Sequence, residues 1–192
     1  MATDIYKLLS EIQKRPVMYL GKPSLWLLAS FLFGYIMALE TNEIEIEENP
    51  SFRSFQSWVV MKLQSNEGNV VWNYLLMKSC DGDEEKAFEK FFVYLEEFKN
   101  KQERILLWVQ LPLASTPKTY KVLRSDGRYY RESPVCLVQI VEYVGVKGVF
   151  IRCINTLGKL KDEIYNVSLE KSLEYAEMLY KIKKDDWKSA KT

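Results

Sequence analysis

The chain has 192 residues, a net charge of +1 and no histidine. The absence of histidine excludes Ser-His-Asp and Cys-His nucleophilic sites and removes the commonest metal ligand and general base. Hydrophobic residues make up 47% of the chain and aromatic residues 14%, which excludes a disordered protein and favours a globular one with a substantial core. We therefore expect a protein that is not an enzyme and that holds no catalytic residue, metal ion or cofactor.

Apolar residues at helical spacing dominate the sequence up to about residue 110. The first expected helix has Thr3 as its N-cap, ends before Pro16 and carries four apolar residues on one face: Ile5, Leu8, Leu9 and Ile12. Ser24 is the expected N-cap of a second helix over residues 25–41, whose apolar run of about 15 residues is short for a membrane span of about 20. This helix is hydrophobic nearly all round, so we expect neighbouring elements to cover it on several sides.

Three further segments complete the helical half. Residues 51–63 place Phe52, Phe55, Val59 and Leu63 at helical spacing, and residues 70–77 favour a short helix, with a strand as the alternative. The turn at residues 81–83 opens an amphipathic helix whose apolar stripe consists of Ala87, Phe88, Phe91, Phe92, Leu95 and Phe98. The apolar residues 104–111 fit either a further helical turn or a strand.

An acidic run lies between these helices, formed by Glu43, Glu45, Glu47 and Glu48. Alternation with Ile44 and Ile46 would place the first three carboxylates on one side of an extended segment. One interpretation is a solvated loop; the other is an electrostatic surface for a basic partner, which would speed association. A calcium site is not indicated, because the spaced acidic pattern of a calcium loop is absent.

A domain boundary is expected at residues 111–118, which include Pro112 and Pro117. Residues 1–110 carry 12 basic and 16 acidic side chains, whereas residues 111–192 carry 15 and 10, so the net charge changes from −4 to +5. We therefore predict a helical domain over residues 1–111 and a second domain over residues 118–192.

The second domain is predicted to be a four-stranded antiparallel meander with one helix packed across it. Its strands are expected at residues 120–124, 135–144, 148–154 and 161–166, with a hairpin turn at Asp126-Gly127. Ser168 caps a final helix with five residues on its apolar face: Leu169, Leu173, Ala176, Leu179 and Tyr180. The predicted fold class is α+β, with a helical N-terminal half and a small antiparallel sheet that the C-terminal helix covers.

The expected hairpin is rich in basic and aromatic residues: Lys121, Arg124, Arg128, Tyr129, Tyr130 and Arg131. Such residues could bind phosphates and stack on bases, which makes a nucleic-acid-binding or regulatory protein the alternative function. The other interpretation is an exposed sheet edge, where Lys and Arg prevent pairing with other strands.

The three cysteines, Cys80, Cys136 and Cys153, form no Cys-x-x-Cys pair. No cleavable signal segment is visible at the start of the sequence, and the number of cysteines is odd. We therefore expect a protein of the reducing cytoplasm without a membrane anchor, with Cys136 and Cys153 as core thiols.

The segment Arg15-Pro-Val-Met-Tyr-Leu-Gly21 is the most distinctive motif. Pro16 ends a helix, Gly21 permits a turn, and Met18 and Leu20 are expected to fill a core. With the apolar helix that contains Gly34-Tyr35, the motif resembles bacterial immunity proteins of polymorphic-toxin and contact-dependent inhibition systems, over about residues 5 to 100. The resemblance implies a cytoplasmic protein that neutralises a cognate toxin domain by stoichiometric binding, with the acidic run on Lys and Arg of the toxin and with Arg15 and Tyr19 internal.

Overall fold

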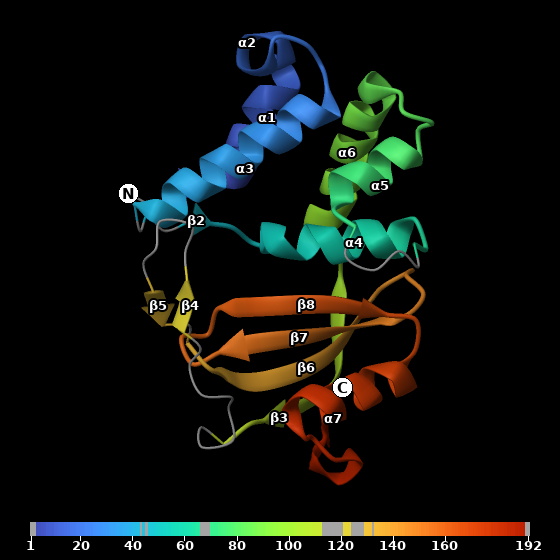
Figure 1. Cartoon of the computed structure of the whole chain (residues 1–192). Helices are drawn as coiled ribbons and strands as arrows, with labels where there is room; N and C mark the ends of the chain where they lie inside the picture. The colour runs from blue at the N-terminus through green and yellow to red at the C-terminus, as the bar shows by residue number, and fades with distance from the viewer. Residues whose placement is uncertain are drawn as a thin grey trace. The chain divides into compact units, whose positions relative to one another are not determined.

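The structure is a computed structural model that describes residues 3–42, 44, 46–65, 70–112, 121–123, 129–131 and 133–190. It divides into two compact units, residues 1–100 and 101–192. Helices form the first unit, and an antiparallel sheet with a C-terminal helix forms the second (Figure 1). The α+β class is therefore confirmed, with helices first and strands second.

The helical unit keeps most of the predicted helix starts. The Ser24 hydroxyl accepts a hydrogen bond from the N–H of Leu27 at 3.3 Å, and Asp83 accepts one from the N–H of Lys86 at 3.0 Å. Asp4, and not Thr3, caps the first helix, because its carboxylate accepts from the N–H groups of Tyr6 and Lys7. The elements are β1 (Thr3–Asp4), α1 (Ile5–Lys14), α2 (Pro16–Leu20), α3 (Leu25–Thr41), β2 (Ile46–Glu47), η1 (Phe52–Ser54), α4 (Phe55–Lys62), α5 (Trp72–Lys78) and α6 (Glu84–Lys99).

An aromatic cluster forms the core where α4, α5 and α6 meet. The Phe55 ring lies 5.2 Å from Phe91, 5.5 Å from Phe98 and 5.9 Å from Trp72, measured between ring centroids, and it is edge-on to all three. Edge-to-face packing of this kind adds to the hydrophobic gain of burial. All six residues of the stripe predicted on α6 are buried, and the segment predicted at residues 70–77 forms helix α5 from Trp72 to Lys78, not a strand.

Helix α3 is less covered than the sequence predicts. Leu25, Leu28, Leu32 and Leu39 are buried on one side, where α2, α5 and α6 are its neighbours. On the other side Trp26, Leu27 and Phe33 are 41%, 39% and 71% exposed. The prediction of cover on several sides is therefore wrong, because an uninterrupted apolar run carries no periodicity that tells one face from the other.

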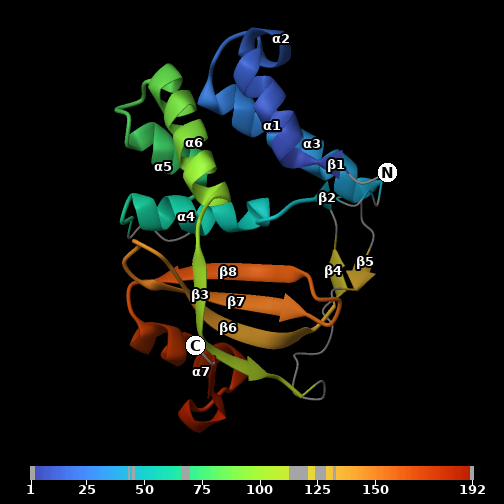
Figure 2. The same cartoon turned by 180° about the vertical axis from the view of Figure 1, so that it is seen from behind.

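Five of the described strands form one antiparallel sheet in the second unit, in the order β8-β7-β6-β3-β9. Strand β6 pairs with β3 on one side and with β7 on the other, as Figure 2 shows from behind. The elements are β3 (Glu103–Gln110), β4 (Lys121–Leu123), β5 (Tyr129–Arg131), β6 (Val135–Tyr143), β7 (Val149–Asn155), β8 (Leu160–Asn166), α7 (Leu169–Tyr180), η3 (Lys184–Asp186) and β9 (Lys188–Ser189).

This topology corrects the predicted boundary and the predicted meander. Residues 103–110 form a strand of the sheet, so the units divide after Asn100 and not between residues 111 and 118. The segment over residues 121–123 pairs with β5 in a separate two-stranded sheet, and β3 and β9 join the three predicted strands in its place. Short apolar runs do not distinguish helix from strand, and long-range pairing with β6 decides the conformation of residues 103–110.

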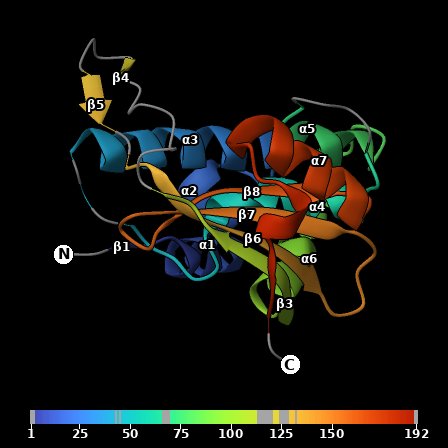
Figure 3. The ribbon, with the colours of Figure 1, turned by 90° about the horizontal axis from the view of Figure 1, so that it is seen from below.

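Helix α7 packs on one face of the sheet, across β7 and β8 (Figure 3). The core between them includes Val138, Ile140, Ile151 and Cys153 from the sheet and Ala176 from the helix. Ser168 caps α7 as predicted and accepts from the N–H of Lys171. Of the five residues expected on its buried face, Leu169 and Leu179 are exposed.

Candidate partner-binding surface

The distinctive motif of the sequence forms α2 and lies on the surface. Val17 is 65% exposed and Met18 is 72% exposed, and Arg15 is also exposed. The expectations that Met18 fills the core and that Arg15 is internal are therefore wrong. The physical reason is that α2, with five residues, is too short to bury one of its faces. None of the five is buried, and Tyr19 and Leu20 are only partly covered.

The backbone on both sides of α2 fixes how this surface is presented. Pro16 occupies the first helical position, where its missing N–H costs nothing, and the N–H of Arg15 donates to the carbonyl of Glu11 at 3.1 Å. Gly21 ends the helix with φ of 80° and donates to the carbonyl of Val17 at 3.0 Å. Only glycine adopts this conformation without strain. The three exposed side chains therefore stand on a short helix between two fixed ends.

The acidic run is partly described. Glu43 and Glu45 lie outside the described residues, and Ile46–Glu47 form β2, which pairs in parallel with Thr3–Asp4. The Glu48 carboxylate accepts hydrogen bonds from the Ser51 hydroxyl at 2.7 Å and from the N–H of Phe52 at 3.0 Å. Glu48 therefore stabilises the start of η1, and a contact of the four glutamates with a basic partner stays a prediction.

The basic hairpin is described at its two strands. Lys121 pairs with Arg131, Val122 with Tyr130 and Leu123 with Tyr129, so the predicted antiparallel pairing is confirmed. Arg124, Arg128 and the turn at residues 126–127 lie outside the described residues. Nucleic-acid binding by this hairpin stays a prediction.

A cluster of charged side chains spans the sheet, and sequence reasoning missed it. One oxygen of Glu163 accepts from the Tyr143 hydroxyl at 3.0 Å and from the Lys101 amine at 3.3 Å, and the other accepts from Nε of Arg152 at 3.0 Å. The Arg152 guanidinium also donates to both oxygens of Glu103, at 3.1 and 2.6 Å. These residues, which we call the sheet charge cluster, come from β3, β6, β7 and β8, and Lys101 lies two residues before β3.

Burial controls the electrostatics of the sheet charge cluster. The side chains of Glu163 and Lys101 are 1% and 6% exposed. Burial lowers the pKa of the Lys101 amine to about 8, although the Glu163 carboxylate opposes this change. The pKa of the Tyr143 hydroxyl is raised, first by burial and second by the negative charge of Glu163. A lysine with a pKa near neutrality is typical of catalytic sites, but here the amine and its carboxylate are enclosed and bonded to each other, which favours a structural role.

The sequence does contain one sign of this cluster. Arg152 stands in the middle of an otherwise apolar strand, between Ile151 and Cys153. A buried guanidinium requires a carboxylate partner, which points to an acidic residue on a neighbouring strand. The register then identifies that residue as Glu163, directly opposite Arg152.

The described residues lack the features of two other classes of site. No group of three or more acidic or cysteine side chains among them could hold a metal ion. Within the same part of the chain, no helix has the length and apolar character needed to cross a membrane.

Comparisons with protein-family models, with curated proteins and with solved structures found no match for this chain. The α2 surface and its sequence motif are therefore the features of this chain that bear most directly on function.

Proposed function

We propose that this chain is an immunity-type binding protein that neutralises a cognate bacterial toxin domain by direct stoichiometric binding, without catalysis. The observation that carries the proposal is the exposure of Val17 and Met18, at 65% and 72%, within the motif that carries the resemblance to immunity proteins. Packing within this chain does not explain why either position carries an apolar side chain. A partner that covers them would gain the hydrophobic free energy that this chain does not use.

The composition of the α2 surface supports recognition of a protein. Methionine and arginine are enriched at the centres of protein interfaces, and a few such residues supply most of the binding energy. Arg15 brings a cation beside two apolar side chains, and because both ends of the short helix are fixed, the backbone loses little conformational entropy on binding. The net charge of −4 over residues 1–110 would steer a basic toxin domain towards this half of the chain.

The proposal expects a gene for a toxin domain immediately upstream of the gene for this chain, and the test is neutralisation of that domain. Co-expression of the full chain should restore growth of cells that produce the toxin domain, and calorimetry should give a one-to-one complex. The variants Val17→Asp and Met18→Asp should each weaken binding at least tenfold. The matched control is Val93→Asp on α6, because Val93 is also an exposed apolar residue, at 57%.

Two results would contradict the proposal. The first is failure of the wild-type chain to bind the toxin domain encoded upstream. The second is full protection by a chain that carries both Val17→Asp and Met18→Asp, which would remove the α2 surface from the interface.

The second candidate function is binding of single-stranded nucleic acid by the basic hairpin. The observation that favours this candidate is the register of the hairpin, which pairs Lys121 with Arg131 and so brings two basic residues to the same level of the two strands. Fluorescence anisotropy with a labelled oligothymidine should then show binding that weakens steeply between 50 and 200 mM salt, as is usual for phosphate contacts. Equal anisotropy of the wild-type chain and of Lys121→Glu would exclude this function.

A further inference from the structure

The presentation of the α2 surface depends on how the two ends of α2 are fixed, because none of its five residues is buried. At the first end, the N–H of Arg15 donates to the carbonyl of Glu11, so α2 follows α1 directly. At the other end the chain turns at Gly21 and enters α3 after three further residues. A helix of one turn is not stable by its own hydrogen bonds. Contacts of this turn therefore decide how firmly Val17 and Met18 are presented.

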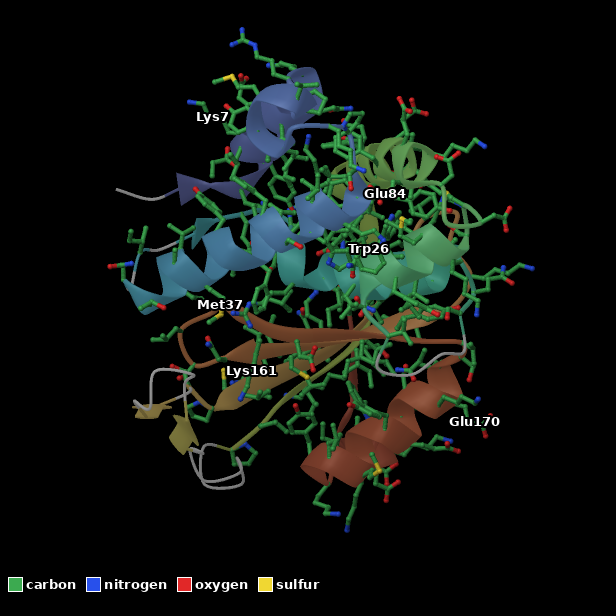
Figure 4. The ribbon with its side chains drawn as sticks, turned by 45° about the horizontal axis from the view of Figure 1, so that its top comes forward. Lys7, Trp26, Met37, Glu84, Lys161 and Glu170 are labelled. Carbon is green, nitrogen blue, oxygen red and sulfur yellow. The ribbon has the colours of Figure 1, made fainter. Side chains whose placement is uncertain are left out.

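Glu84 contacts this turn from a distant part of the sequence. It is the first residue of α6, and its Oε2 atom lies 3.3 Å from Nζ of Lys22. The same carboxylate accepts a hydrogen bond from the hydroxyl of Ser24. Figure 4 labels Glu84 close to the start of α3, which Trp26 marks. One side chain of α6 therefore contacts two of the three residues that separate Gly21 from α3.

Burial and charge both favour this contact. Ser24 is fully buried, and the Oε2 atom of Glu84 is buried although the whole Glu84 side chain is 34% exposed. The hydrogen bond from Ser24 and, to a lesser extent, the Lys22 amine lower the pKa of the Glu84 carboxyl. The carboxylate also lies where α3 and α6 both begin, and helix dipoles favour a negative charge there. Lys22 is 64% exposed, so its ion pair alone would contribute little, and the buried Ser24 gives the contact a fixed geometry.

We propose that Glu84 is a positioning residue for the α2 surface, because its carboxylate fixes the turn after α2 through Lys22 and Ser24. Glu84 belongs to α6 and not to the sequence motif, and it need not touch the partner. The effect on binding rests on the proposed function, whereas the effect on α2 itself does not. A residue that orders a binding segment in advance raises affinity, because less conformational entropy is lost when the complex forms.

Amide exchange measured by NMR tests the effect of Glu84 on α2 without any partner. The reporter is the N–H of Gly21, which donates to the carbonyl of Val17 at 3.0 Å. Glu84→Lys puts a second cation beside Lys22, so we expect the Gly21 amide to exchange nearly as fast as in an unfolded chain. The control Glu85→Lys makes the same change of charge at an exposed side chain in the same turn of α6, and it should leave this exchange unchanged. Equal exchange of Gly21 in the two variants would overturn the proposal.

An exchange of charges tests whether Glu84 acts through Lys22. The double variant Lys22→Glu with Glu84→Lys again places one anion and one cation at these two positions, so the Gly21 amide should regain part of its protection. The control pair, Lys22→Glu with Glu85→Lys, leaves two anions together and should not regain it. A double variant that exchanges as fast as Glu84→Lys alone would overturn the proposal.

Affinity for the toxin domain separates positioning from stability. Calorimetry uses the full chain at a temperature where thermal denaturation shows both single variants to be folded. Glu84→Lys should then bind about fivefold more weakly than Glu85→Lys, because a smaller fraction of the chain presents α2 in the bound conformation. Equal affinities would assign Glu84 to stability alone and would overturn the proposal. If the wild-type chain does not bind the toxin domain, the proposed function fails, and the exchange of Gly21 still decides whether Glu84 fixes α2.

Discussion

The helical unit and the sheet unit both expose large apolar side chains, but they differ in the charges that they enclose. The helical unit leaves Met18 and Phe33 on its surface, whereas the sheet unit encloses the ion pair of Lys101 and Glu163. Exposed apolar side chains are free to bind a partner, but enclosed ions need partners of their own chain. The enclosed charges therefore serve the fold of the sheet unit, whereas recognition by the helical unit is what we propose.

The largest effect on stability is expected from a substitution in the aromatic core of the helical unit. Phe91→Ala removes a ring that lies 5.2 Å from Phe55 and 5.0 Å from Trp72, and it should lower the free energy of unfolding by about 4 kcal/mol. Hydrogen exchange of α4 and α6 peptides in urea measures this loss within the helical unit. Val93→Ala is the control on the same helix and should cost far less, because Val93 is exposed. Equal losses for the two variants would contradict a core centred on this cluster.

A slightly smaller loss of stability is expected when Glu163 is removed from the sheet charge cluster. Glu163→Ala leaves the enclosed Lys101 and Arg152 without that carboxylate, and it should cost about 3 kcal/mol in the sheet unit. The control is Glu142→Ala, which removes an ion pair with the exposed Arg104 and should cost about 0–1 kcal/mol. Exchange of β7 and β8 peptides reports both losses. If Glu142→Ala cost as much as Glu163→Ala, burial would not be what gives the cluster its importance.

The stability of the sheet unit should depend on pH because the Lys101 amine is enclosed. The pKa of Lys101 is about 8 in the folded chain and near 10.4 in an unfolded one, so between these values the unfolded chain binds more protons. Stability should therefore rise with pH in this window, by at most about 1.4 kcal/mol for each pH unit. Urea denaturation from pH 7 to 9.5 measures the slope. Lys101→Met should lack this rise, and a slope identical to that of the wild type would contradict burial as its cause.

The smallest effect on stability is expected at the α2 surface. Met18→Ser should change the free energy of unfolding by less than about 0.5 kcal/mol, because Met18 is 72% exposed. The corresponding change at a buried residue of the neighbouring helix, Leu9→Ala, should cost about 3 kcal/mol. Thermal denaturation distinguishes the two. A large loss of stability for Met18→Ser would indicate that Met18 packs in the core, and it would weaken the proposal that the α2 surface recognises a partner.

Local patterns were sufficient for most of the helical unit. Caps such as Ser24 and Asp83 mark helix starts by hydrogen bonds within three residues, and the stripe on α6 follows from the period of the helix alone. Both signals depend only on neighbours along the chain, so they can be recognised in the sequence without knowledge of tertiary contacts.

Long-range contacts account for what the sequence did not predict. The strand at residues 103–110 takes its conformation from β6, about thirty residues further on, and its own apolar run does not identify it. The sheet charge cluster joins Lys101 to Glu163, a separation of 62 residues. The surface position of Met18 depends on how short α2 is. The first helix ends before Pro16 as predicted, but Pro16 also begins α2, a helix that the sequence pattern did not predict.

The pairing of β3 with β9 has a consequence for synthesis. Leu107 pairs with Ser189, so the ribosome adds about 80 residues after β3 before its second edge can be covered. At roughly 5–20 residues per second, this takes about 4 to 16 s. During that time an apolar strand of a nascent chain has an open edge, which is where intermolecular pairing begins. Chaperone demand for this protein should therefore be greatest between the appearance of β3 and the arrival of the last few residues of the sheet.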